Sequence, residues 1–248
     1  MGSPSSWEFS KINAQLEQDG WQRGGLIIPD TQEYFSDPAQ KFTIKEAQNI
    51  SFVVDMPWML PLEEQASYLN IALKQVMTLR PEENISLIGH SAGALAARLW
   101  LIQHYNPAIV RLISIAAPNL GTPRAIDALR VTSATIGPID AMRNLFGGKL
   151  YNTVRRSRKL VREFTPPSKR NQNILYWMNQ QPHPEIEYIS IVREDRRGRD
   201  QDWLMSADSQ DLNNVPALRG KSEAYIVNQS HELHPEDGAL IASLLRQK

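Results

Sequence analysis

The chain has 248 residues, 42% of them hydrophobic and 22% charged, which is typical of a globular protein rather than a disordered one. Lys and Arg total 27 and Asp and Glu also total 27, so the net charge indicates neither nucleic acid nor an anionic membrane as a partner. The absence of cysteine excludes disulfides, thiolate catalysis and cysteine-ligated metals, and no apolar run is long enough to span a bilayer.

Short apolar runs rich in β-branched residues alternate with longer stretches of helical periodicity, as in parallel α/β sheets. The predicted strands cover residues 24–28, 50–55, 84–89, 110–116, 185–192 and 224–228. The predicted helices between and around them cover residues 7–19, 61–79, 91–105 and 238–246. We therefore predict one α/β domain over residues 1–248, with a mostly parallel sheet of about six strands and flanking helices.

The interval 121–184 carries no strand signal and is predicted to be a helical cap or lid inserted over one end of the sheet. From Arg143 to Arg170 it contains nine Lys or Arg residues and one acid, Glu163. A basic helix is predicted over residues 151–164, with an apolar side formed by Tyr151, Val154, Leu160, Val161 and Phe164. Such a helix fits a lid that meets anionic lipid, or a solvated helix packed on the domain, and we favour the second interpretation.

Residues 89–93, Gly-His-Ser-Ala-Gly, match the pattern G-x-S-x-G at the point where an apolar strand ends and a helix begins. This turn is too sharp for ordinary dihedral angles, and Gly89 and Gly93 would let strand and helix approach each other around Ser91. Ser91 would then project at the carboxyl edge of the sheet, where the amide of Ala92 can donate to an oxyanion. A glycine-rich turn with a solvent-facing serine is the alternative.

A serine hydroxyl needs a base to become a nucleophile, and with this motif an acid and then a histidine follow in the chain. His231 comes just after the last strand, at the same edge as Ser91, and is the preferred base over His234, His183 and His104. A metal site from His231 and His234 lacks a third ligand, so no metal is predicted. The acid should follow the fifth strand. The candidates there are Asp202, which we prefer, Asp200 and Asp195.

Four segments resemble bacterial lipases and esterases of the α/β-hydrolase superfamily. They are the Ser91 motif with its strand, the turn at residues 117–123, the acid loop at residues 202–212 and the histidine turn at residues 230–233. The likeness runs from about residue 20 to 248 and is poor in the insertion. It implies the α/β-hydrolase fold and a Ser91–His231–Asp202 triad that works without a cofactor.

One departure from the family concerns the oxyanion hole, whose second donor usually follows a His-Gly pair at the end of the first core strand. Here that strand ends in Ile-Pro-Asp, and Pro29 has no amide hydrogen to donate. Thr31 is our candidate for the second donor beside Ala92. Trp58, Met59 and His90 are the candidates for contact with the substrate, although packing explains Trp58 and Met59 equally well.

We therefore expect a carboxylic ester hydrolase of esterase or lipase type, acting on a small-molecule or lipid ester, with peripheral lipid contact left open. A thioesterase, acyltransferase or amidase would use the same triad. A catalytically silent α/β-hydrolase that serves as a binding protein is the alternative outside the enzymes. The start of the chain fits a cytoplasmic protein or an exported one whose leader has been removed.

Overall fold

The computed structural model describes residues 8–36, 43–133, 155–194 and 202–246, the side chains of 131–133 excepted. All six predicted strands are present, with boundaries shifted by one or two residues, and a short strand is added. The strands are β1 (Gln22–Ile28), β2 (Glu33–Phe35), β3 (Ile50–Val54), β4 (Ile85–His90), β5 (Ile109–Ile115), β6 (Glu187–Arg193) and β7 (Ser222–Val227).

The strands pair in two sheets, in the orders β2-β1-β3 and β4-β5-β6-β7. Every pair is parallel except the hairpin of β1 and β2, where Leu26 faces Phe35. Side chains from both sheets meet in one apolar cluster, in which Ile85 of β4 packs with Ile27 of β1 and Val54 of β3. The prediction of a mostly parallel α/β fold is confirmed, with the strands paired in sheets of three and four rather than in one sheet of about six.

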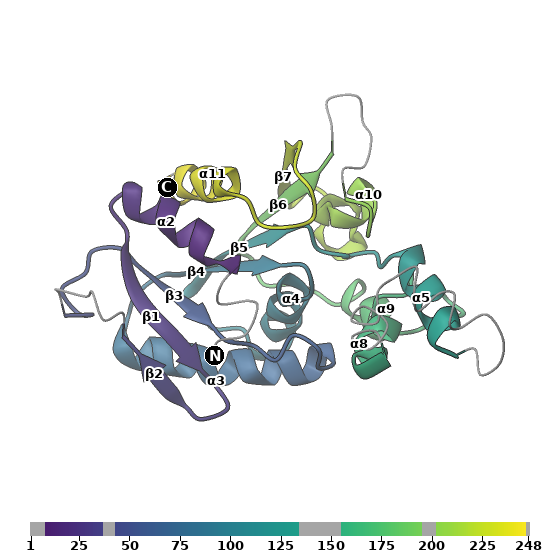
Figure 1. Cartoon of the computed structure of the whole chain (residues 1–248), viewed down its shortest axis with the longest axis horizontal. Coiled ribbons are helices and arrows are strands. Elements are labelled where there is room, and N and C mark those ends of the chain that lie inside the picture. The colour runs from purple at the N-terminus through teal and green to yellow at the C-terminus, as the bar shows by residue number, and fades with distance from the viewer. Residues whose placement is uncertain (1–7, 37–42, 134–154, 195–201, 247–248) are drawn as a thin grey trace.

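Helices cover both faces of the four-stranded sheet (Figure 1). On one face, α3 (Leu62–Leu79) and α4 (Ala92–His104) bury leucines against Leu112 of β5. On the other, α2 (Ser10–Gln18) and α11 (Pro235–Arg246) pack against Ile113 and its neighbours. Leu112 and Ile113 point to opposite faces because successive side chains alternate along a strand, so β5 is buried on both sides.

In the described residues between β5 and β6, three helices pack beyond the ends of the strands (Figure 1). They are α5 (Pro123–Ser133), α8 (Arg158–Glu163) and α9 (Ile174–Met178). Leu160, Leu175 and Met178 are buried in the same cluster as α3 and α4. The expected basic helix thus exists in part, and Tyr151 and Val154 lie outside the described residues. Burial of Leu160 supports the interpretation of a helix packed on the domain.

Short helices and turns complete the region between β6 and β7. They are α10 (Ala207–Gln210) and the two 3₁₀ turns Leu212–Asn214 and Pro216–Leu218. None of the helices in the described part of the chain is both long and apolar enough to cross a membrane.

Glu163 attaches α8 to the start of α3, because its Oε2 accepts a hydrogen bond of 2.8 Å from the amide of Leu62. An anion at a helix N-terminus is favourable, yet burial raises the pKa of Glu163 to about 6, and the nearby Glu63 and Glu64 act in the same direction. The folded protein therefore binds this proton more tightly than the unfolded chain does.

Glu163→Gln is expected to change how stability depends on pH. A raised carboxyl pKa adds stability that is complete below about pH 4.5 and is lost as pH rises through about 6. The melting temperature of the variant should therefore rise relative to that of the wild type as the pH increases from 4.5 to 7. Thermal unfolding of both proteins across this range measures the effect, with Glu236→Gln, exposed in the first turn of α11, as control. A difference in melting temperature that does not vary with pH would contradict the prediction.

Candidate active site

Ser91 lies between β4 and α4 in a backbone conformation that only glycine adopts readily. Its φ is 51° and its ψ is −122°, and its amide donates a hydrogen bond of 2.9 Å to the carbonyl of Ile115 on β5. Residues other than glycine hold such angles at a cost of about 1–3 kcal/mol, usually where a function requires them. The strained strand-to-helix turn that the sequence predicted is confirmed.

Only one of the two glycines in the motif is needed for close packing. A Cβ on Gly89 would lie 2.4 Å from the Cα of Ala94, well inside the distance that real side chains allow. A Cβ on Gly93 would meet nothing within 4 Å. The prediction for Gly93 is therefore wrong, because at the second position of α4 its missing side chain would point into open space rather than toward the strand.

The structure brings His231 and Asp202 together. His231 Nδ1 lies 2.6 Å from Oδ2 of Asp202, and the other carboxylate oxygen accepts a hydrogen bond of 2.8 Å from the amide of Leu204. Asp202 is 2% exposed, so both of its oxygens are buried and hydrogen-bonded. Because a carboxylate only accepts, it holds the proton of neutral His231 on Nδ1 and leaves Nε2 free to accept one.

The other candidates for acid and base lie elsewhere. Asp195 and Asp200 fall outside the described residues. His234 is bonded through Nε2 to the hydroxyl of Ser230 at 2.9 Å. His183 contacts the carbonyl of Gln181, and burial lowers its pKa to about 4. His104 is exposed on α4, as expected.

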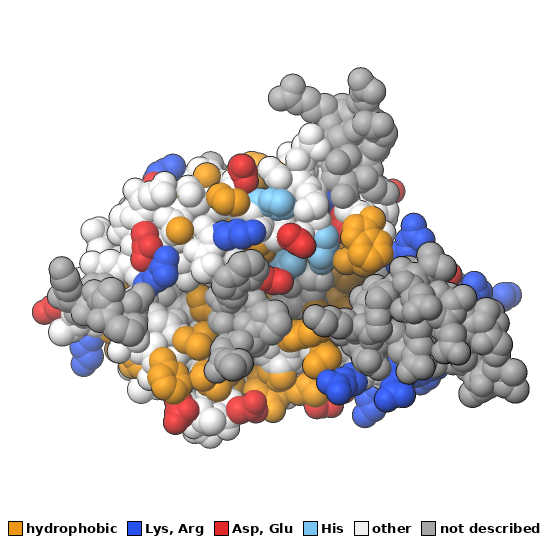
Figure 2. All heavy atoms as spheres, in the orientation of Figure 1, with side chains coloured by type: hydrophobic (Ala, Val, Ile, Leu, Met, Phe, Trp, Pro, Cys, Tyr) orange, Lys and Arg blue, Asp and Glu red, His pale blue; other side chains and the backbone are white. Residues whose placement is uncertain are grey.

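His90 connects the pair of His231 and Asp202 to β4, the strand that Ser91 follows. Its Nε2 lies 2.8 Å from the carbonyl oxygen of His231, and the two imidazole rings are 4.9 Å apart between centroids. Figure 2 shows histidine side chains gathered with acidic ones on one face of the molecule. Among the hydrogen bonds of the described residues, none joins Ser91 to His231. Such bonds are often long without substrate and tighten when it binds.

The two expected oxyanion donors differ in position. Ala92 begins α4, where the first amides have no acceptor within the helix. Thr31 lies on an exposed turn after β1, and its hydroxyl donates to Glu33 at 2.8 Å. The same turn is attached to α3, since Gln75 donates to the carbonyl of Gln32 at 2.6 Å. No contact within the described ranges connects Thr31 with Ser91, so its role stays a prediction.

The three residues expected to contact substrate also separate. Trp58 and Met59 form a turn after β3, and the carbonyl of Trp58 accepts a bond of 3.3 Å from Gln65. The Trp58 side chain is 39% exposed, which suits contact with a ligand. The His90 side chain is only 11% exposed and is engaged with the backbone of His231. This geometry favours a positioning role for His90 over contact with substrate.

Sequence reasoning missed a buried ion pair behind the histidine turn. Arg193, the last residue of β6, binds both carboxylate oxygens of Asp237 at 2.6 and 2.8 Å, and its side chain is fully buried. It also donates to the carbonyl of Glu232, next to His231, at 3.1 Å. The two residues are far apart in the chain. The only signal in the sequence is an arginine that closes an apolar strand.

Two segments that carry the family resemblance pack on each other. The hydroxyl of Ser209 donates to the carbonyl of Gly121 at 2.7 Å and accepts from the amide of Leu120 at 3.2 Å. The side chain of Asn119 donates to the carbonyl of Gln210 at 2.9 Å. The turn after β5 therefore supports the loop that begins with Asp202, and this contact fixes the acid relative to the sheet.

Arg98 lies beneath this turn, fully buried in α4. It donates to the side-chain oxygens of Asn119 at 3.0 Å and Asn179 at 2.6 Å. No carboxylate of the described chain pairs with it, and burial lowers its pKa to about 9. Its role is to join α4, the turn after β5 and α9.

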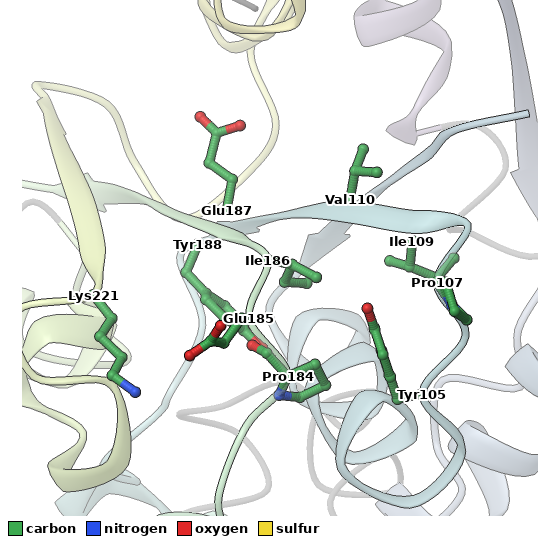
Figure 3. Close-up of a pocket in the computed structure, with 10 residues that line it drawn as sticks. All are labelled: Tyr105, Pro107, Ile109, Val110, Pro184, Glu185, Ile186, Glu187, Tyr188 and Lys221. Atoms are coloured by element: carbon green, nitrogen blue, oxygen red, sulfur yellow. The ribbon is translucent and has the colours of Figure 1, made fainter.

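A cavity of about 560 Å³ lies at the amino ends of the strands (Figure 3). The first residues of β5 and β6 line it, whereas Ser91 follows the last residue of β4. Because these strands are parallel, the cavity and Ser91 lie at opposite ends of the strands. It is therefore separate from the candidate active site. Its lining residues are Tyr105, Pro107, Ile109, Val110, Pro184, Glu185, Ile186, Glu187, Tyr188 and Lys221.

Comparison with known proteins agrees with this architecture. A family described as a PGAP1-like alpha/beta domain matches residues 59–135, which include the Ser91 motif and the turn after β5. None of the curated proteins matches the chain.

Several bacterial structures are similar to this one at low sequence identity. A Listeria innocua gene product has a TM-score of 0.59 at 12% identity, covering 100% of this chain and 91% of that one. A lipase-esterase related protein from Clostridium acetobutylicum has a TM-score of 0.53 at 12% identity, covering 95% and 88%. The lipase BlEst2 from Bacillus licheniformis has a TM-score of 0.53 at 11% identity, covering 79% and 77%. The chain therefore has the α/β-hydrolase fold, and its residues 59–135 match the PGAP1-like alpha/beta domain.

Proposed function

We propose that the chain is a serine hydrolase that cleaves carboxylic esters, with Ser91 as nucleophile, His231 as base and Asp202 as the acid. The observation that carries this proposal is the bond of 2.6 Å between His231 Nδ1 and Asp202. His231, whose carbonyl accepts a hydrogen bond from His90, is thus paired with an acid. Ser91, the residue after His90, lies in a strained turn. These are the parts that acyl transfer requires.

In the proposed reaction, Oγ of Ser91 attacks the ester carbonyl while Nε2 of His231 takes the hydroxyl proton. The tetrahedral intermediate places negative charge on the former carbonyl oxygen, which the amide of Ala92 can stabilise at the N-terminus of α4. The intermediate collapses when the protonated His231 gives its proton to the leaving alcohol. Water, activated by His231 in the same way, then releases the acid and restores Ser91.

Asp202 would act through orientation and charge. Its buried carboxylate fixes the ring of His231 and stabilises the imidazolium that forms in each half-reaction. An ester is the favoured substrate class because structurally similar proteins include a lipase and a lipase-esterase related protein. Exposed aromatic side chains support an apolar acyl group, since Trp203, next to Asp202, is 65% exposed and Trp58 is 39% exposed.

We also propose that residues 121–184 form the cap of a single domain. Two of their described helices, α8 and α9, share a core cluster with α3 and α4. The amide of Thr122 donates to the carbonyl of Phe164 at 2.7 Å, which closes the segment on itself. Exposed cations on its outer side, including Arg155, Arg156, Lys159 and Arg162, leave peripheral contact with lipid as an extension of this proposal.

The alternative outside the enzymes is a silent binding protein. It is favoured by Pro29, which cannot donate, and by the position of Thr31 on a turn that is attached to α3. A second oxyanion donor contributes about 10²–10³ in rate, so a protein without one would be a weak catalyst or none.

A fluorophosphonate probe separates the two proposals, because it labels only a serine whose proton a base removes. We expect the wild-type protein to be labelled, Ser91→Ala to be unlabelled, and Ser67→Ala, which alters an exposed serine on α3, to be labelled normally. Absence of labelling in the wild type would favour the silent protein. A series of p-nitrophenyl esters of increasing chain length, beside a matched thioester and anilide, would then define the substrate class.

A further inference from the structure

Three successive carbonyls of the histidine turn are each held by a side chain from a different element. The carbonyl of His231 is bonded by Nε2 of His90 at 2.8 Å, from β4. That of Glu232 is bonded by Nη2 of Arg193 at 3.1 Å, from β6. That of Leu233 is bonded by Nζ of Lys11 at 3.2 Å, from α2. We call these three donors the carbonyl clamp.

The histidine turn needs such partners because it lies between β7 and α11, outside any helix or strand. Its carbonyls therefore receive no hydrogen bonds from regular secondary structure, and these partly buried groups are satisfied by side chains instead. The single hydrogen bond to Asp202 restrains the orientation of the His231 ring. The position of the ring also depends on the backbone that carries it, which the carbonyl clamp holds.

Arg193 joins this turn to the acid loop. Its own amide donates to the side chain of Gln210 at 2.9 Å, and Gln210 belongs to the loop that Asp202 begins. Its partner Asp237 also accepts from the amide of His234 at 2.8 Å. A buried ion pair is weak evidence for stability, since apolar residues of similar volume often serve as well. Here Arg193 also donates to the carbonyl of Glu232 in the histidine turn, so orientation of this turn is the better explanation for the pair.

His90 is suited to hold the turn without interfering with proton transfer. A carbonyl only accepts, so Nε2 of His90 must carry the proton. Burial lowers the pKa of His90 to about 4, and the charges of His231 and Arg193 lower it as well, while the hydrogen bond to the carbonyl of His231 and the charge of Asp237 act in the opposite direction. Glu8 also faces it, with Oε2 3.8 Å from Nδ1. Near neutral pH the ring is thus a neutral donor and does not compete with His231 for the proton of Ser91.

We propose that His90 and Arg193 are positioning residues, which set the distance between His231 and Ser91 by holding the carbonyls of His231 and Glu232. This inference rests on the proposed function of the triad. It goes beyond the triad because it assigns the residue before the nucleophile and a buried ion pair to the same task, from two different strands, β4 and β6.

The decisive variant is His90→Phe, which keeps a planar ring but removes the donor. A displacement near 1 Å at a catalytic group can cost about 10² in rate. We therefore expect kcat for a p-nitrophenyl ester and the rate of fluorophosphonate labelling to fall together by about 10², with KM little changed. His90→Gln, whose amide can donate, should recover part of both rates. His104→Phe, the same change on exposed α4, is the control and should match the wild type.

A second test removes the ion pair without leaving a lone buried charge. The double variant Arg193→Met with Asp237→Leu replaces both charges by apolar side chains, which proteins often tolerate. We expect its melting temperature to stay near that of the wild type while kcat and the labelling rate fall. If the double variant does not fold, His90→Phe and His90→Gln decide alone.

The outcomes separate this inference from the function on which it rests. If the wild type is not labelled and Ser91→Ala behaves identically, the proposed function fails. If the wild type is labelled but folded His90→Phe is labelled at the same rate, only the positioning role is overturned. An equal loss in His90→Phe and His90→Gln would also overturn it, because the donor would then not be the feature that matters.

Discussion

Asp202→Asn is expected to lower kcat by about 10⁴ while leaving the fold and KM nearly unchanged. The size follows from serine hydrolases in which this change leaves the geometry intact but selects the wrong histidine tautomer. Here the reason can be stated atom by atom. One oxygen of Asp202 accepts from the amide of Leu204 and the other accepts from His231.

An asparagine has a single side-chain oxygen for these two donors. If that oxygen keeps the amide of Leu204, the NH₂ group faces Nδ1 of His231 and donates to it. Nδ1 must then lack a proton, so that Nε2 carries it and cannot accept one from Ser91. If the side chain turns over, the amide of Leu204 is left facing a donor in a buried site, which costs about 1–3 kcal/mol.

Steady-state kinetics with a p-nitrophenyl ester, together with the labelling rate of the fluorophosphonate probe, would measure this loss. Asp208→Asn is the matched control, because Asp208 is an exposed acid six residues further along the same loop. If Asp202→Asn kept the kcat and labelling rate of the wild type, Asp202 would not be the acid of the triad, and Asp195 and Asp200 would be the next candidates.

The sequence predicted the fold well because the buried strands are continuous apolar runs, which few other structures accommodate. It missed β2 for a physical reason. Glu33–Phe35 has three residues, is largely exposed and gains its strand character from pairing with β1 across the turn at Pro29–Gln32. That turn depends on Gln32 at φ 55°, and glutamine gives no sign of such a conformation.

The pairing of His231 with Asp202 could be predicted because the order of elements places both residues after strands that end at one edge. The residues that pack around this pair could not be predicted. Arg193 and Asp237 meet only because β6 and α11 pack in a particular way, and no local pattern marks a charge that will be buried. The second oxyanion donor remains a prediction for a related reason, since its position depends on a loop conformation rather than on a strand.

Gly89→Ala is expected to lower the free energy of unfolding more than the addition of a methyl group at any other position of the motif. Its Cβ would stand 2.4 Å from the Cα of Ala94 and 2.6 Å from its amide nitrogen. Both are backbone atoms, so no side chain can rotate away, and α4 must move relative to β4. Overpacking of a core commonly costs 1–3 kcal/mol, and this contact should reach about 3 kcal/mol or more. Because Ser91 lies between the displaced elements, hydrolysis should be lost as well.

Gly93→Ala provides the comparison within the same motif. Its Cβ would meet nothing within 4 Å, and Gly93 lies inside α4 without a positive φ. Alanine restricts the unfolded chain and favours a helix, so this variant should be more stable than the wild type by about 0.5 kcal/mol. Urea unfolding of both variants tests the pair, since the same methyl group should change the unfolding free energy in opposite directions. If both variants lost stability equally, the packing of β4 against α4 would differ from the one described, and the strain at Ser91 would need another cause.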